Sequence, residues 1–178
     1  MTDPDRDPIA AAHEQWVGHG WDEAADGMTL VTSITRAHQL LVERIEETLR
    51  PHDLTFARYE ILRLLAFSRR RSMPMSRLGS LLQVHATSVT SAVARLESQG
   101  LVERLRRESD RRVVLASLTP LGEQRVEAAT AALNADVFTS PGLDREDVRA
   151  ATRLLAELRA AHGDTVAPTA PTQAPLNA

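Results

Sequence analysis

The sequence contains no cysteine and no lysine, and only 3% of its 178 residues are aromatic. The absence of cysteine excludes a disulfide framework, a thiolate metal site and thiol chemistry. With so few aromatic residues, a core must be built mainly from Leu, Val, Ile and Ala, which are plentiful here. No apolar run approaches the roughly 20 residues that a membrane-spanning helix requires. The first residues are acidic and lack the apolar segment of a secretory signal, so we expect a soluble, cytoplasmic protein without a membrane partner.

All Lys/Arg positions of the chain are arginine, and these arginines are unevenly distributed along the sequence. Between Arg58 and Arg112 the chain has 12 arginines and 5 acidic residues, whereas the rest has 9 arginines and 19 acidic residues. A basic segment within an acidic chain is typical of an element that binds a polyanion such as nucleic acid. The alternatives are codon usage that favours arginine and an ordinary solvated surface, although such a surface usually mixes its charges more evenly.

Apolar periodicity predicts a mainly helical chain. Residues 9–25 predict a short amphipathic helix that is interrupted near Gly18 and Gly20. Over residues 28–50, side chains of one stripe recur at spacings of three and four, which predicts a long helix that Pro51 ends. This stripe consists of Val31, Ile34, His38, Leu41, Ile45 and Leu49.

Two short helices joined by a tight turn predict a helix-turn-helix over residues 76–99. Ser76 is expected to cap the first helix, which ends near Leu82, and the second begins at about Ala86. Gly100 stands where a left-handed C-terminal cap is needed. By itself this pattern is a weak signal, because many helix pairs share it.

A β-hairpin directly after the second helix would make this a winged helix-turn-helix. The alternating residues of this wing, 101–118, flank a polar turn, and five arginines lie between residues 104 and 112. Two more helices are predicted within residues 120–162, the last one capped by Asp144. Residues 164–178 are rich in proline and poor in apolar side chains, which predicts a disordered tail.

The order of these elements and the motif at the wing resemble the MarR family of bacterial regulators. That family's pattern is Asp-x-Arg, five residues, Leu-Thr and a nearby Gly, which Asp110, Arg112, Leu118–Thr119 and Gly122 match. The link "LESQGLVER", residues 96–104, also looks like the family's link from recognition helix to wing.

This resemblance implies that residues 28–163 form a mainly α domain with a small β-hairpin wing. It implies that the long helices, residues 28–50 and 120–162, form a two-fold dimer, to which a monomeric bundle is the alternative. Residues 1–27 are then an N-terminal extension, and its Trp16 and Trp21 resemble the added first helix of the family's urate-responsive branch.

The resemblance places DNA contacts on the second helix and on the wing. Short hydroxyl side chains let a helix lie close to base edges and phosphates, and arginines at a narrow hairpin tip fit a minor groove. Helix capping and solubility would explain the hydroxyls alone, but not beside a basic wing. The expected DNA-binding residues are Ser76, His85, Thr87, Ser88, Thr90, Ser91, Arg95, Arg106, Arg107, Arg111 and Arg112, with Asp110 bracing the tip as the family's Asp does.

The family often binds an anionic aromatic or carboxylate ligand between the dimer helices and the DNA-binding lobe. Taken singly, the candidate residues would also fit a packing Trp, a core Tyr and surface arginines. No cofactor, catalytic site or metal site is expected, because the histidines lack metal-ligand spacing and no nucleophile or phosphate-loop motif is present. The residues that could supply stacking and charge to a ligand are Trp21, His38, Arg58, Tyr59 and Arg63.

We therefore expect a ligand-responsive DNA-binding transcriptional regulator, acting as a repressor and not as an enzyme. It would bind a pseudo-palindromic operator on double-stranded DNA as a homodimer and be released by a small anionic effector. One alternative is a methyltransferase with a winged-helix module, but its catalytic domain would need many more residues and a Gly-rich cofactor loop. Another is a winged-helix protein-interaction module, which has no need of a charged tip.

Overall fold

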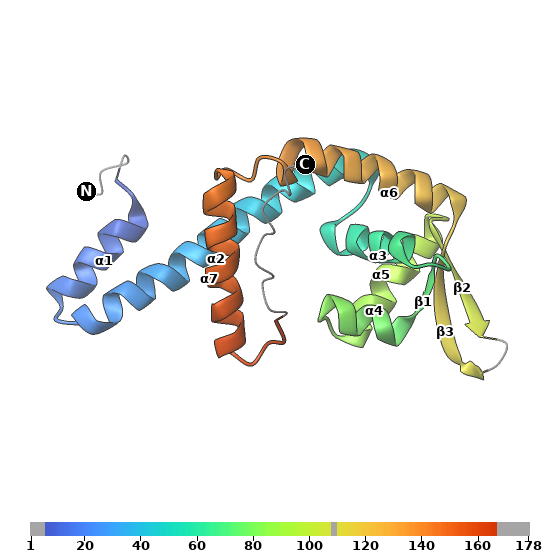
Figure 1. The fold of residues 1–178 in the computed structure, drawn as a ribbon, viewed down its shortest axis with the longest axis horizontal. Helices are drawn as coiled ribbons and strands as arrows, with labels where there is room; N and C mark the ends of the chain where they lie inside the picture. Colours follow the sequence, from blue (N-terminus) through green and yellow to red (C-terminus); the bar gives the residue numbers. More distant parts are fainter. Residues whose placement is uncertain (1–5, 108–109, 167–178) are drawn as a thin grey trace, which may run out of the picture. The chain divides into compact units, whose positions relative to one another are not determined.

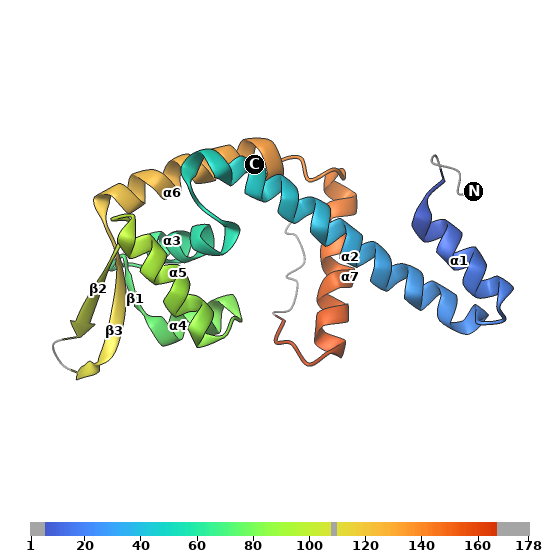
Figure 2. The ribbon, with the colours of Figure 1, turned by 180° about the vertical axis from the view of Figure 1, so that it is seen from behind.

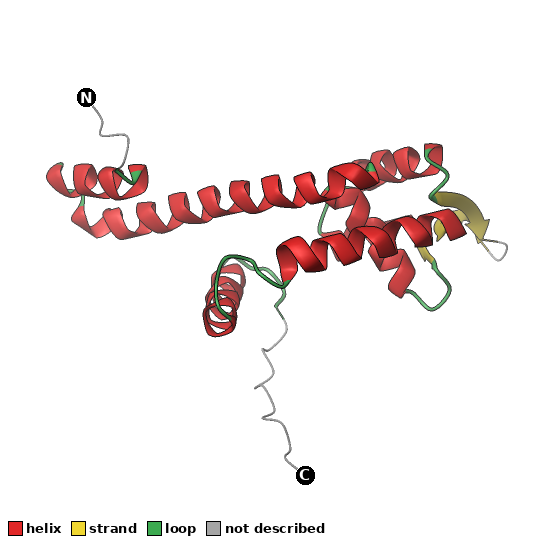
Figure 3. Cartoon of the chain, turned by 90° about the horizontal axis from the view of Figure 1, so that it is seen from above, coloured by secondary structure: helices red, strands yellow, loops and turns green. Residues whose placement is uncertain are grey.

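The computed structural model describes residues 6–107 and 110–166, and for residues 107 and 110–112 it describes the backbone without the side chains. Contacts divide the chain into two units after Val137. The first unit holds helices α1 to α6 and strands β1 to β3, and the second holds α7 (Figure 1). Helix dominates, and the described strands all belong to one small sheet (Figure 3). The predicted mainly helical winged fold is confirmed.

Helices α1 (Pro8–Gly18) and α2 (Asp22–Leu49) form a helical hairpin at the start of the first unit. The side chain of Asp7 caps α1 by accepting a hydrogen bond from the Ile9 backbone N–H at 3.0 Å. Gly20 has a φ of 79°, which glycine adopts without strain, and it makes the turn between the helices. The interruption predicted near Gly18 and Gly20 is therefore present.

The start of α2 differs from the prediction, because the helix begins at Asp22 and not at Met28. Acidic side chains in its first turn interact favourably with the positive end of the helix dipole and stabilise this start. Gly27 interrupts the apolar pattern, but a glycine costs a helix only about 1 kcal/mol. Helix α1 runs beside this part of α2 (Figures 1 and 2), and His13 Nε2 lies 3.1 Å from Asp26 Oδ1. Packing against α1 thus extends α2 beyond its local sequence pattern.

The core of the first unit lies where α3 (Phe56–Phe67) meets α5, α6 and the sheet. Thr55 caps α3, and a short 3₁₀ turn (Arg50–His52) joins it to α2. Tyr59 contributes the one aromatic ring that is buried among the described residues. The largest fully buried side chains are the aliphatic residues Leu49, Ile61, Leu62, Leu65, Leu78, Leu96, Leu101 and Leu133.

Helix α4 (Met75–Leu82) is the first helix of the helix-turn-helix. The prediction that Ser76 caps it is wrong, because the helix begins at Met75 with Pro74 in the capping position and no side-chain cap. Pro74 ends strand β1 with φ −59° and ψ 139°, so the fixed proline torsion starts the helix one residue early. Ser76 lies inside α4, where its carbonyl accepts a hydrogen bond from Ser80 Oγ at 3.2 Å.

Helix α5 (Ala86–Ser98) is the second helix of the motif and begins where the sequence predicts. Gln83 ends α4 in the left-handed region with φ 54°, and His85 is the N-cap of α5. Gly100 has a φ of 71°, which confirms the predicted left-handed position after the helix.

The wing is a three-stranded antiparallel sheet with the order β1-β3-β2. Strands β2 (Val102–Arg107) and β3 (Asp110–Leu118) form the predicted hairpin, with Leu105 opposite Leu115. Strand β1 (Ser72–Pro74) pairs with the base of β3. Three residues are too short for alternation to show, so no apolar period marks this strand in the sequence.

Helix α6 (Pro120–Leu133) follows the wing and continues as a π-helical turn (Asn134–Phe138). Thr119 caps it by accepting a hydrogen bond from the Gly122 N–H at 3.0 Å. The same hydroxyl donates to the Gly100 carbonyl at 2.8 Å. One side chain therefore ties the end of α5 to the start of α6, which gives the Leu-Thr and Gly of the sequence motif a structural reason.

The second unit contains α7 (Arg145–Ala161). Asp144 caps it as predicted, accepting hydrogen bonds from two backbone N–H groups at 2.8 and 2.9 Å. No residue of α7 is buried, and Leu154 and Leu155 are 62% and 45% exposed. Most of the predicted disordered tail, residues 167–178, lies outside the described residues. The division into residues 1–27, 28–163 and 164–178 stays a prediction.

Candidate nucleic-acid interface

Helix α5 has one buried face and one exposed polar face. Val89, Val93 and Leu96 are buried in the core. The opposite face is exposed and carries the hydroxyl side chains that the sequence predicts for DNA contact, together with one arginine. These exposed residues are Thr87, Ser88, Thr90, Ser91 and Arg95.

The N-terminal end of α5 is held by its own first residues. His85 Nδ1 lies 2.5 Å from Thr87 Oγ1 and 3.5 Å from the Thr87 backbone N. Thr90 Oγ1 donates to the Ala86 carbonyl at 2.9 Å. Thr87 and Thr90 thus stabilise the helix locally, whereas no hydroxyl bond holds Ser88 or Ser91 among the described contacts.

One flank of α5 faces the sheet. An open hollow of about 400 Å³ lies there, and Ser76, Thr90 and Arg104 are among its lining residues. Arg104 Nε lies 3.2 Å from Glu97 Oε2, and its Nη2 donates to the Thr90 carbonyl at 3.3 Å. Arg104 therefore braces α5 against β2, a role that sequence reasoning missed because these residues lie on different elements.

The other flank of α5 faces the start of α3. An open hollow of about 610 Å³ lies there, and it contains two arginines, Arg58 and Arg95, together with the hydroxyls of Thr55, Ser88 and Ser91. Both flanks of the exposed helix face therefore carry arginine, which on the sheet side is Arg104, paired with Glu97.

The wing brings Arg106 to the surface, where it is exposed. The backbone of Arg107 pairs with that of Asp110 at the tip. The expected contacts of Arg107, Arg111 and Arg112, and the bracing role of Asp110, concern side chains outside the described part of the chain.

The comparisons with known proteins agree with this geometry. Residues 54–114 match the model of the MarR family. Sco5413, a MarR family transcriptional regulator from Streptomyces coelicolor, is 41% identical in sequence, with a TM-score of 0.72. That similarity covers 80% of this chain and 99% of Sco5413. The chain belongs to the MarR family.

Two further relatives support the assignment. Sco3205, a MarR family transcriptional regulator from Streptomyces coelicolor whose structure is in complex with DNA, is 25% identical with a TM-score of 0.69. The similarity covers 79% of this chain and 90% of Sco3205. The HTH-type transcriptional regulator YdcH of Bacillus subtilis is 29% identical over 53% of this chain and 65% of its own length.

Family membership makes this chain a DNA-binding transcriptional regulator and not an enzyme. The predicted fold and family are confirmed. The likeness of the N-terminal segment to the urate-responsive branch of the MarR family stays a prediction.

The residues predicted to bind a ligand do not gather in one pocket of this MarR-family chain. Trp21 precedes α2 and His38 lies midway along it, so they are about 25 Å apart at 1.5 Å per helical residue. Trp21 is 54% exposed and stacks on His19 at 5.3 Å between ring centroids. Arg58 lies beside the recognition helix α5 instead.

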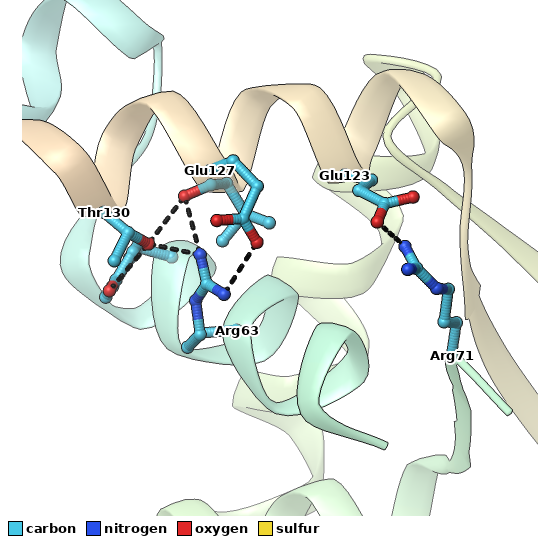
Figure 4. Close-up of polar contacts among 7 residues, drawn as sticks. Arg63, Arg71, Glu123, Glu127 and Thr130 are labelled. Atoms are coloured by element: carbon cyan, nitrogen blue, oxygen red, sulfur yellow. Dashed lines mark hydrogen bonds and ion pairs between the residues drawn. The ribbon is translucent and has the colours of Figure 1, made fainter. Parts of the chain in front are cut away.

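Arg63 of α3 is bound to side chains of α6 (Figure 4), and Tyr59 of α3 also contacts α6. Arg63 Nη1 lies 2.9 Å from Glu127 Oε1, and Arg63 also donates to the side chain of Thr130. Tyr59 Oη lies 3.1 Å from Thr130 Oγ1. The hydrogen bond and the charge of Arg63 lower the pKa of Glu127. Both residues therefore hold α3 against α6.

Neither a metal-binding cluster nor a membrane-spanning helix is present among the described residues. No group of three or more His, Cys, Asp or Glu residues is placed to hold a metal ion within residues 6–107 and 110–166. Among these residues no helix is long and apolar enough to span a bilayer.

Proposed function

We propose that this chain is a homodimeric repressor that binds a pseudo-palindromic operator in the cytoplasm and that a small organic anion releases it. The observation that carries the DNA part is the exposed hydroxyl face of α5 with arginines on both flanks. Ser76 and His85 lie close to this face, at the start of α4 and of α5.

The dimensions of α5 suit the major groove. A helix with its side chains is about 10–12 Å across, and the major groove of B-DNA is about 12 Å wide. Thr87 and Ser91 would then reach base edges, where hydroxyls both donate and accept hydrogen bonds. The wing would enter the adjacent minor groove with Arg106, Arg107, Arg111 and Arg112, and Asp110 would order its tip.

The dimer part rests on apolar side chains that a single chain leaves exposed. Leu30 and Val31 of α2 are 53% and 65% exposed, and Leu40 and Leu41 are 48% and 40% exposed. Exposed apolar patches of this kind mark association surfaces. A two-fold dimer would place two α5 helices about 34–36 Å apart, one turn of DNA, and so require inverted half-sites.

The effector part rests on the MarR resemblance and on the exposed stack of Trp21 and His19. We propose an anionic aromatic or carboxylate compound as effector, bound beside Trp21 and not at His38, which lies about 25 Å away along α2. Titrating tryptophan fluorescence with urate, salicylate and citrate tests this, with DNA affinity measured in parallel. If no such compound changes either signal, the regulator has no effector of this class and the tryptophans are structural.

The DNA part is tested by fluorescence anisotropy with duplexes from the DNA that flanks the gene. We expect at least one duplex to bind about 10³-fold more tightly than its scrambled sequence. Ser91→Asp, which puts a carboxylate on the exposed face of α5, should remove most of this preference without lowering the melting temperature. Equal, weak binding of all duplexes would favour the alternative, a winged-helix module that binds a protein.

A further inference from the structure

The hollow between α3 and α5 holds two arginines, Arg58 and Arg95, that are not ion-paired within the described part of the chain. Within residues 6–107 and 110–166, no carboxylate forms an ion pair with Arg58 or Arg95. By contrast, Arg63 and Arg71 on the same helix and its following loop pair with Glu127 and Glu123 of α6 (Figure 4). Two arginines thus remain available to an anion from outside.

The guanidinium of Arg58 is held in place by neutral acceptors. Its Nε donates to Thr55 Oγ1 at 3.2 Å, and its Nη1 lies 3.3 Å from the Asp53 carbonyl and 3.5 Å from Gln99 Oε1. Gln99 in turn donates to Asp53 Oδ2 at 2.6 Å. These contacts order the side chain at the edge of the hollow while leaving its charge intact.

The position of this hollow on α5 decides which anion reaches it. Ser88, Ala92 and Arg95 are spaced by four and three residues, so they form one flank of the helix. Thr90, with Arg104 beside it, forms the opposite flank toward the wing. A helix that fills a major groove has one phosphate strand along each flank, because its diameter nearly equals the groove width.

We infer that the hollow of Thr55, Arg58, Ser88, Ser91 and Arg95 binds a backbone phosphate of the DNA strand that borders the major groove on the side away from the wing. This inference rests on the proposed DNA binding by α5. It moves Arg58 from the predicted ligand site to the DNA interface. The two arginines and the serine hydroxyls all donate hydrogen bonds to phosphate oxygens, which is how proteins fix their register on a duplex.

The salt dependence of operator binding tests this. Each phosphate contact contributes about −0.9 to the slope of log affinity against log salt, so losing one contact per subunit makes the slope of a dimer shallower by about 1.8. For Arg58→Gln, the affinity loss at 50 mM salt should therefore be about tenfold greater than at 200 mM. Arg58→Lys keeps the charge and should keep nearly the wild-type slope.

Arg70→Gln is the matched control, because Arg70 is exposed, lies in the same basic segment and is on the loop after α3. Arg95→Gln, which breaks no hydrogen bond in the described structure, should repeat the effect of Arg58→Gln if the latter variant melts early. Slopes of Arg58→Gln and Arg95→Gln that equal that of Arg70→Gln would overturn the inference while leaving DNA binding intact. A wild-type protein that binds no duplex at any salt concentration would overturn the proposed function as well.

Discussion

Gly122→Ala should destabilise the protein far more than a single added methyl group usually does. A Cβ at Gly122 would lie 2.1 Å from the Leu101 carbonyl oxygen and 2.8 Å from Leu118 Cδ1. Ordinary contact needs at least 3.4 Å, and a backbone carbonyl cannot swing aside, so α6 would have to move by about 1 Å or more. That shift would stretch the bond from the Thr119 N–H to Leu101 O and the bond from the Gly122 N–H to Thr119 Oγ1.

Overpacking lowers the free energy of unfolding by about 1–3 kcal/mol, and each stretched hydrogen bond lowers it by about 1 kcal/mol more. The higher helix propensity of alanine returns about 1 kcal/mol. We expect a net loss of about 3 kcal/mol, which corresponds to a fall in Tm of roughly 6–12 °C for a chain of this size. Circular dichroism melts of Gly122→Ala and wild type measure it. Gly79→Ala is the control, because its Cβ would meet nothing closer than 3.5 Å and should leave the Tm unchanged or slightly higher. If Gly122→Ala melts within about 2 °C of wild type, Gly122 does not lie as close to the Leu101 carbonyl as the structure shows.

Three other predictions follow from the same structure. Leu41→Asp should give a monomeric mass by light scattering at micromolar concentration, because it places an unpaired charge in the proposed dimer interface; a dimeric mass would argue against that interface. Arg63 lowers the pKa of Glu127 in the folded state. The pair therefore stabilises the folded protein fully at pH values above the ordinary Glu pKa of about 4.3, and this stabilisation is lost as the pH falls. The Tm advantage of wild type over Glu127→Gln should therefore shrink as the pH falls below that ordinary value, and an advantage independent of pH would contradict it. Gln99→Glu should lower the Tm by setting a carboxylate against Asp53, where an amide now donates at 2.6 Å, and adding Asp53→Asn should restore it; a double variant no better than the single one would count against the pair.

The ends of several helices could be predicted because local rules determine them. Thr55, Thr119 and Asp144 cap helices where their side-chain oxygens reach free backbone N–H groups, and Gly100 takes the left-handed position after α5. The start of α2 could not be predicted, because packing against α1 extends the helix across Gly27. The cap at Ser76 failed because the torsion of Pro74 starts α4 one residue earlier.

The residues of the candidate DNA interface that lie on α5 could be predicted from the sequence. Those that approach α5 from other elements could not. The 3.6-residue period places Val89 and Val93 inside, and so turns Ser88 and Ser91 outward. Arg58 and Arg104 could not be assigned in this way, because each approaches α5 from a different element. The ion pair of Arg63 with Glu127 could not be predicted either, because the two residues are 64 positions apart and no local pattern shows the pair. The sequence therefore leaves Arg63 as a candidate for a ligand site.

The proposed repressor binds DNA through α5 as one of a symmetric pair of helices. Selection of tight-binding duplexes from a random pool with the wild-type protein, followed by sequencing, tests this claim. We predict enrichment of two inverted half-sites whose centres are 10–10.5 base pairs apart, or a multiple of that spacing. A pool that shows no enriched sequence, or a single half-site without an inverted partner, would contradict the claim.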